Sequence, residues 1–213
     1  MLIGTGGVLD VISDFNVQEL SEEQMAKAVE VAHRARKKVM VHAEGTEGIK
    51  AAVRAGVDSI EHGTMLDDEG AALMAKKGTW LVPTLYTFQL GVAVGLNQGQ
   101  DPISLKKGQE LLKHQQPAFE RALKAHVKIA LGLDEDPEYL PKELAALVRG
   151  GMSPLQALQT ATIPRCGTAE LVRPDWHYRT GQVRRHHRGD RRSHQRYSDD
   201  GKNRVRDEGR RGG

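Results

Sequence analysis

Apolar residues are arranged along this chain in two ways, as short unbroken runs and as helical stripes. The run from Val39 to Ala43 is too short and too rich in β-branched residues for a helix, so it predicts a strand. After Ser21, apolar residues recur at the i, i+3, i+4, i+7 spacing of one helix face. The pattern predicts strands at residues 2–3, 39–43, 57–62, 79–82 and 127–131, and helices at 21–38, 46–55, 67–77, 102–126, 141–150 and from 154 onward.

Local signals mark several ends of these elements. Ser21-Glu22-Glu23-Gln24 has the form of a capping box that opens a helix. Gly78 ends another helix, and Pro83 closes the strand before it. Pro117 lies inside the long helix at 102–126 and predicts a kink there.

Strands and helices therefore alternate, which is typical of a parallel sheet covered by helices, the α/β class. Five strands are predicted. A closed eight-stranded α/β barrel needs about 250 residues, so this pattern fits either an open sheet or the second half of a barrel.

Ligand-type side chains stand at three of the predicted strand ends. His42 and His62 end two runs, and Asp134 follows a third. Because the carboxyl ends of parallel strands meet on one face, these residues indicate a site for a divalent metal such as zinc. Thr84 and Tyr86 follow another strand end and are predicted to contact substrate. The alternative is that His42, His62 and Asp134 are only structural.

The glutamates beside the two histidines receive a different prediction. Glu44 and Glu61 flank His42 and His62, and we expect them behind the metal ligands or on the surface.

The composition excludes sites built from several cysteines, and it excludes a membrane span. Cys166 is the single cysteine, which excludes an internal disulfide and a cysteine-built zinc knuckle. No apolar run has the roughly 18 residues of a membrane span, and the start lacks a leader pattern. We therefore expect a soluble, cytoplasmic protein without a membrane partner.

Three further segments occur in order along the chain, namely VMVHAEGTEGIKAAVRAGVDSIEHGTMLDDEGAALMAKKGTWLVPTLYT, KIALGLDEDP and LVRGGMSPLQALQTATI. Together they resemble the metal-dependent amidohydrolase superfamily, in its imidazolonepropionase-like and Xaa-Pro dipeptidase-like branch. The resemblance implies a TIM-type (β/α)8 barrel, of which about strands 4–8 are present, and hydrolysis of C–N bonds in a small molecule or dipeptide. It also implies that His42, His62 and Asp134 bind one or two divalent metals, usually zinc, and that Asp134 is the general base.

The chain departs from that family in informative places. The His-x-His pair of the first family strand has no counterpart. The lysine of the fourth strand, which is carboxylated in binuclear members, would fall at or beside Met1 and is absent. Leu133 stands where the family usually has threonine. A half barrel leaves unpaired sheet edges, so we expect marginal stability unless the chain forms a homo-oligomer. An inactive, non-catalytic α/β fragment is the alternative.

The last part of the chain has a different composition. Residues 177–213 carry 12 basic and 5 acidic residues, whereas residues 1–176 have a net charge of −4. We divide the chain into a partial barrel at 1–175 and a disordered basic tail at 176–213. Such a tail is typical of a nucleic-acid-binding arm, which is the second alternative function.

Back-translation offers another origin for this tail. Residues 176–197, read one base later, permit GTIAPGKYADIIAVTGDPISDI, the kind of segment that follows an amidohydrolase barrel. We therefore expect a frameshift near Asp175 and no nucleic-acid partner. Sequencing the source DNA tests this, because the idea fails if the shifted frame encodes another string.

Overall fold

The computed structural model describes residues 1–9, 11–98 and 101–162. The strands are β1 (Leu2–Ile3), β2 (Met40–Ala43), β3 (Ser59–His62), β4 (Trp80–Val82) and β5 (Lys128–Ile129). The α-helices are α1 (Glu22–Arg34), α2 (Thr46–Ala55), α3 (Asp68–Lys77), α4 (Leu85–Gln98), α5 (Pro102–Lys124), α6 (Leu140–Arg149) and α7 (Pro154–Thr162), with a 3-10 turn η1 (Pro137–Tyr139). The predicted boundary at 175/176 and the tail lie outside the described residues.

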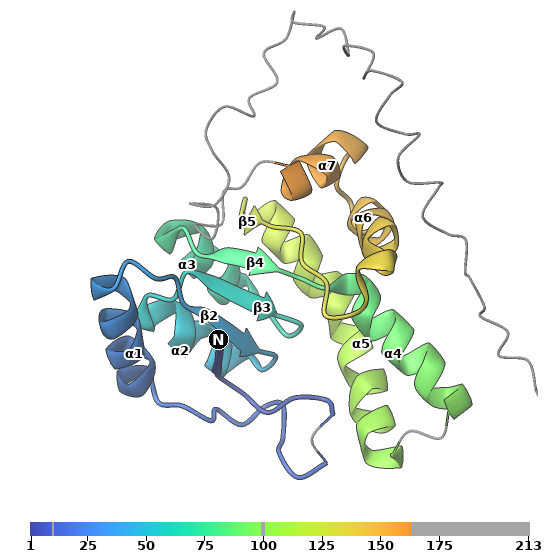
Figure 1. The fold of residues 1–213 in the computed structure, drawn as a ribbon, viewed down its shortest axis with the longest axis horizontal. Coiled ribbons are helices and arrows are strands. Elements are labelled where there is room, and N and C mark those ends of the chain that lie inside the picture. The colour runs from blue at the N-terminus through green and yellow to red at the C-terminus, as the bar shows by residue number, and fades with distance from the viewer. Residues whose placement is uncertain (10, 99–100, 163–213) are drawn as a thin grey trace, which may run out of the picture. The chain divides into compact units, whose positions relative to one another are not determined.

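The five strands form one parallel sheet in the order β1-β2-β3-β4-β5. Each strand therefore lies beside the next one in the chain, and helices connect them (Figure 1). This arrangement confirms the predicted α/β class, and it is that of part of a (β/α)8 barrel.

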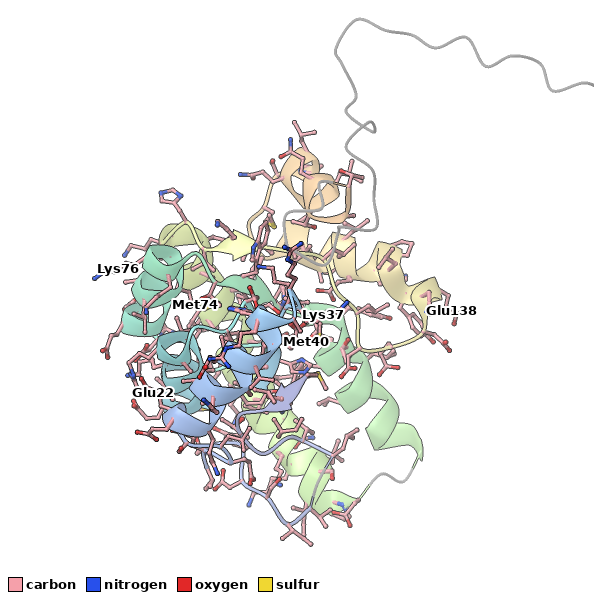
Figure 2. All side chains as sticks on the ribbon, turned by 60° about the vertical axis from the view of Figure 1, so that its left-hand side comes forward. Glu22, Lys37, Met40, Met74, Lys76 and Glu138 are labelled. Carbon is pink, nitrogen blue, oxygen red and sulfur yellow. The ribbon has the colours of Figure 1, made fainter. Side chains whose placement is uncertain are left out.

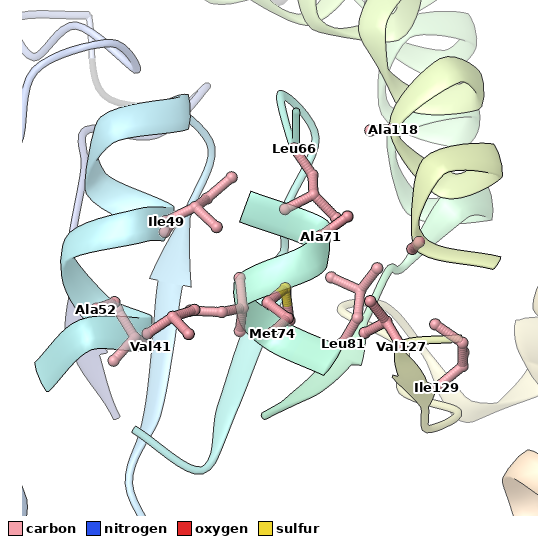
Figure 3. Close-up of a cluster of buried hydrophobic side chains, with 14 of the residues drawn as sticks. Val41, Ile49, Ala52, Leu66, Ala71, Met74, Leu81, Ala118, Val127 and Ile129 are labelled. Carbon is pink, nitrogen blue, oxygen red and sulfur yellow. The ribbon is translucent and has the colours of Figure 1, made fainter. Parts of the chain in front are cut away.

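The register of the sheet separates two rows of side chains. One row, which faces the helices, consists of Leu2, Val41, Ile60, Leu81 and Ile129. These residues pack against α2, α3 and α5, and Figure 3 shows Val41 and Leu81 among side chains such as Met74. The neighbouring row, which includes His42, points to the opposite face, because side chains alternate along a strand. The core thus lies under the helices, and the opposite face is left for a site.

Helix ends follow the predicted signals. Ser21 accepts a hydrogen bond from the Gln24 N–H, and the Gln24 side chain accepts one from the Ser21 N–H, so the capping box is complete. Gly78 closes α3 with a φ of 75°, a conformation that glycine adopts without strain. On α3, Met74 is fully buried, whereas Lys76 projects outward (Figure 2).

The helix α4 was not among the predicted elements. Its sequence, LYTFQLGVAVGLNQ, is apolar almost throughout and contains two glycines, so it shows no single apolar stripe. Pro117 lies within α5, which runs through it from Pro102 to Lys124. Among the described helices, none has both the length and the apolar character needed to cross a membrane.

Candidate metal centre

Three ligand-type side chains meet beyond the carboxyl ends of β2 and β3. His42, Glu44 and His62 each offer one ligand atom, and these three atoms lie within 4.8 Å of one another. The two imidazole rings have centroids 4.8 Å apart and planes 72° apart, so one ring edge faces the other ring. Parallel strands thus bring together groups that are 20 residues apart in the sequence.

The backbone explains why these side chains converge. His42 and Glu44 are two residues apart, so the alternation of an extended chain places both on one face. His62 pairs with Ala43 and would by the same alternation face the helices. Its φ of 68° departs from the extended conformation, and its ring lies beside His42 instead. A positive φ is uncommon for a residue other than glycine and is often found at functional sites.

His62 is buried, and a short hydrogen bond fixes its ring. Its Nδ1 lies 2.6 Å from the Thr84 hydroxyl, so Nε2 is the ring nitrogen left for a ligand. Burial lowers the pKa of His62 to about 3, and the nearby His42 adds to the fall. The imidazole is therefore neutral near pH 7, which is the form that binds metals.

His42 is less enclosed than His62. Burial lowers its pKa, while a hydrogen bond to the Gly6 backbone and the charge of Asp134 oppose the change. A Cβ at Gly7 would lie 3.3 Å from His42 Nε2, so the backbone of this loop passes close to the ring.

Glu44 is the member of the group for which the sequence left two placements open, behind the ligands or on the surface. It is fully buried, and neither carboxylate oxygen has a hydrogen bond within normal distance. Burial raises its pKa to about 8, although Thr64 beside it opposes the rise. Its backbone N–H donates to the Thr5 hydroxyl at 2.9 Å, which fixes the chain at this point. The structure therefore excludes the surface placement of Glu44. Its two-residue spacing from His42 was the available signal that the two side chains share one face of the strand.

Glu61 differs from Glu44 in its surroundings. It is half-buried, and its carboxylate accepts a hydrogen bond from the Ser59 hydroxyl at 2.7 Å. It does not belong to the compact group around His42.

Asp134 lies in the same cavity as the histidines but farther out. It is exposed, and its backbone N–H donates to the Thr87 hydroxyl at 3.4 Å. Its ligand atoms are not part of the group within 4.8 Å. The structure therefore brings His42 and His62 together as predicted and places Asp134 in the cavity wall, where its metal and base roles stay predictions.

The two predicted substrate contacts take other positions. The Thr84 hydroxyl is buried behind His62, and Tyr86 is half-buried with its ring 5.8 Å from that of Tyr139. Neither residue is part of the cavity wall. Just after Thr84, the buried Glu143 carboxylate accepts the N–H groups of Leu85 and Tyr86 at 2.8 and 2.6 Å. These contacts fix the loop that carries Thr84.

An open cavity of about 830 Å³ contains the group. Its wall is formed by the amino-terminal segment, the strand ends, one side of α4 and one side of α5. The described lining residues are Met1, Leu2, Ile3, Gly6, Gly7, Val8, Leu9, Ser13, Glu19, Leu20, His42, Glu44, His62, Thr87, Phe88, Gly91, Val92, Ser104, Leu105, Gly108, Asp134 and Glu135.

A family model and a curated relative identify the family of this chain. The model of the amidohydrolase family matches residues 2–164, about three quarters of the chain. This chain belongs to the amidohydrolase family. Ochratoxinase of Aspergillus niger is 36% identical to it over 164 residues, which are 76% of this chain and 34% of the relative.

Solved amidohydrolase structures agree with the assignment. A Xaa-Pro dipeptidase with methionine bound in its active site is 35% identical, with a TM-score of 0.71, over 75% of this chain and 40% of that one. A prolidase in complex with N-methylphosphonate-L-proline is 30% identical, with a TM-score of 0.70, over 75% of this chain and 40% of that one. The chain thus spans about a third of the length of the curated amidohydrolases it matches.

Proposed function

We propose that this protein is a metal-dependent hydrolase that cleaves amide or peptide C–N bonds in a small molecule or dipeptide. The observation that carries the proposal is the meeting of His42, Glu44 and His62 in the cavity of a member of the amidohydrolase family. Two imidazoles and a carboxylate at strand ends are a donor set that binds divalent metals.

The residues present fit such a metal, with zinc as the first choice. A buried carboxylate without hydrogen bonds is unfavourable, and a bound cation would compensate for the missing partners of Glu44. The contact between Thr84 and His62 Nδ1 resembles the outer hydrogen bond that orients metal-binding histidines. Asp134 is a second carboxylate for the same metal, since it lines the cavity near His42.

Each residue then has a role in hydrolysis. A divalent metal held by His42, Glu44, His62 and Asp134 would supply Lewis acidity and would lower the pKa of the attacking water from 15.7 to about 7. Asp134 takes a proton from the attacking water while the water oxygen forms a bond to the carbonyl carbon. The C–N bond breaks as Asp134 returns this proton to the leaving nitrogen, which yields a carboxylic acid and an amine.

The named relatives support the choice of substrate class. The Xaa-Pro dipeptidase and the prolidase act on, or bind, small ligands with an amino-acid or proline part. Dipeptides, among them Xaa-Pro dipeptides, and N-acyl amino acids are therefore the substrates to test first.

Zinc content and zinc-dependent melting of the purified chain test the proposal. We expect bound zinc to raise the melting temperature of the wild type, and expect His42→Ala and Asp134→Ala to lose this shift. His114→Ala, which removes a histidine paired with Glu110 on α5, is the matched control and should keep it. Hydrolysis of the dipeptides should then require zinc.

The opposite results have distinct meanings. A wild type that neither holds zinc nor gains stability from it would contradict the proposal and favour the non-catalytic α/β alternative. Zinc binding that survives in Asp134→Ala but is lost in Glu44→Gln would contradict the metal role of Asp134 and leave Glu44 as the carboxylate ligand.

A further inference from the structure

Beyond the ligand group, the cavity continues as a space between α4 and α5. Its wall here consists of Phe88, Gly91 and Val92 of α4, Leu105 and Gly108 of α5, and the loop residues Val8 and Leu9. Figure 1 shows the two helices side by side. The ring centroid of Phe88 lies 5.6 Å from that of His62, so this space directly adjoins the candidate metal centre.

The chemistry of this wall is apolar. Ser104 is the polar residue among the α5 lining positions, and its hydroxyl already donates to the Leu9 carbonyl at 3.4 Å. The carboxyl side chains elsewhere in the described wall are Glu19, Asp134 and Glu135, and none of the described lining residues is lysine or arginine. A ligand group that enters between α4 and α5 therefore finds mainly apolar contacts and no lysine or arginine side chain among the described lining residues.

Each of the two helices contributes one glycine to this wall, and the two glycines differ in their surroundings. A Cβ at Gly108 would lie 2.9 Å from Val92 Cγ2, so close packing of the helices explains that glycine. A Cβ at Gly91 would meet nothing within 4 Å, so close packing is not the reason for a glycine at this position. Glycine inside a helix is unfavourable relative to alanine, by about 1 kcal/mol. Because Gly91 has no side chain, the cavity is wider here than it would be with any other residue.

We propose that the space between Val8, Phe88, Gly91 and Leu105 is a subsite for an uncharged apolar or aromatic group of the substrate. Gly91 sets the size of the group that enters. The inference rests on the proposed function in one respect, because an amide held at His42 and His62 would place its substituent beside Phe88. The preferred substrates are thus amides or dipeptides with a large apolar side chain or acyl group next to the scissile bond.

Binding of two matched, uncharged probes to the full chain tests this. N-acetyl-L-phenylalaninamide and N-acetylglycinamide are titrated into the metal-free protein in the presence of a chelator, and binding is followed by NMR chemical shifts. We expect the phenylalanine probe to bind at least about tenfold more tightly, because one added apolar group in such a pocket typically gives tenfold or more. Gly91→Leu should abolish this preference by filling the space.

Ala93→Leu is the matched control, since it adds the same side chain at an exposed position of α4 two residues away. It should keep the preference for the phenylalanine probe. Leu105→Ala changes the α5 side of the subsite and should weaken binding of the phenylalanine probe. This variant tests the subsite if circular dichroism shows that Gly91→Leu does not fold.

Several results would overturn the subsite. They are equal binding of the two probes to the wild type, no binding of the phenylalanine probe, an unchanged preference in folded Gly91→Leu, or the same loss in Ala93→Leu. No step of the test needs hydrolysis, so the subsite and the proposed function succeed or fail separately.

Discussion

The hydroxyl of Thr84 lies 2.6 Å from His62 Nδ1, and this contact leads to a prediction at the scale of single residues. Loss of the outer partner of a metal-binding histidine typically weakens metal affinity 10- to 100-fold. Thr84→Val should therefore weaken zinc binding by about tenfold or more, measured by competition with a chromophoric chelator. Thr79→Val removes another buried threonine hydroxyl, one that donates to the Val57 carbonyl, and should leave the affinity unchanged. Equal effects of both variants would contradict the role of Thr84.

The buried carboxylate of Glu44 predicts a pH dependence of the metal-free protein. Its pKa rises from 4.5 to about 8 on folding, so the folded state holds a proton that the unfolded state releases. Stability from this group is complete below about pH 4.5 and is lost as pH rises through about 8. Urea unfolding in a chelator should thus show the wild type losing stability against Glu44→Gln between pH 5 and pH 8. A difference that stays constant across this range would disprove the prediction.

Glu143 carries the prediction at the scale of secondary structure. This side chain of α6 accepts the first two N–H groups of α4, which would otherwise be buried without partners. Glu143→Ala should lower the free energy of unfolding by about 2 kcal/mol or more, since each unpaired buried group costs about 1–3 kcal/mol. Glu138→Ala, at an exposed position in η1, should change it by less than about 0.5 kcal/mol in urea unfolding. Similar losses in both variants would speak against this cap.

The elements differ in how far the sequence determines them. The helices α1, α2 and α3 follow from apolar periodicity and from local ends such as Ser21 and Gly78, because each signal lies within the element itself. The start of α4 depends on Glu143, 57 and 58 residues away in the chain, and such a partner is invisible to local reasoning.

The same distinction holds within the site. The strand-end positions of His42 and His62 follow from the alternation of strands and helices, and the structure brings the two rings together. The burial of Glu44 depends on the loop that carries Thr5 and on residues after β3 such as Thr64. The inward turn of His62 depends on its positive φ. Neither property is encoded in residue spacing.

At the scale of the whole molecule, the face of the sheet opposite the helices predicts that copies of this chain associate. Ile3 and Met40 on this face are 47% and 36% exposed, and β1 and β5 each have one neighbour in the described sheet. Met40 is labelled in Figure 2. Exposed apolar side chains beside unpaired strand edges favour self-association.

We therefore expect the purified chain to form a homo-oligomer, measured by size-exclusion chromatography with light scattering. Met40→Glu should shift it toward the monomer by placing a charge on this face. Val31→Glu, at an exposed apolar position of α1, should leave the assembly unchanged. A monomeric wild type, or dissociation by Val31→Glu alone, would rule out this face as the contact.

The closeness of the ligand group along the chain has a consequence for the order of folding. His42 and His62 belong to one strand–helix–strand unit, β2-α2-β3, so their meeting closes a loop of only 20 residues. Closing a short loop loses less chain entropy than pairing β5, which begins 46 residues after β4 ends. We therefore expect the two imidazoles to come together early, and a divalent metal captured at that stage would act as a nucleus on which the remaining strands assemble.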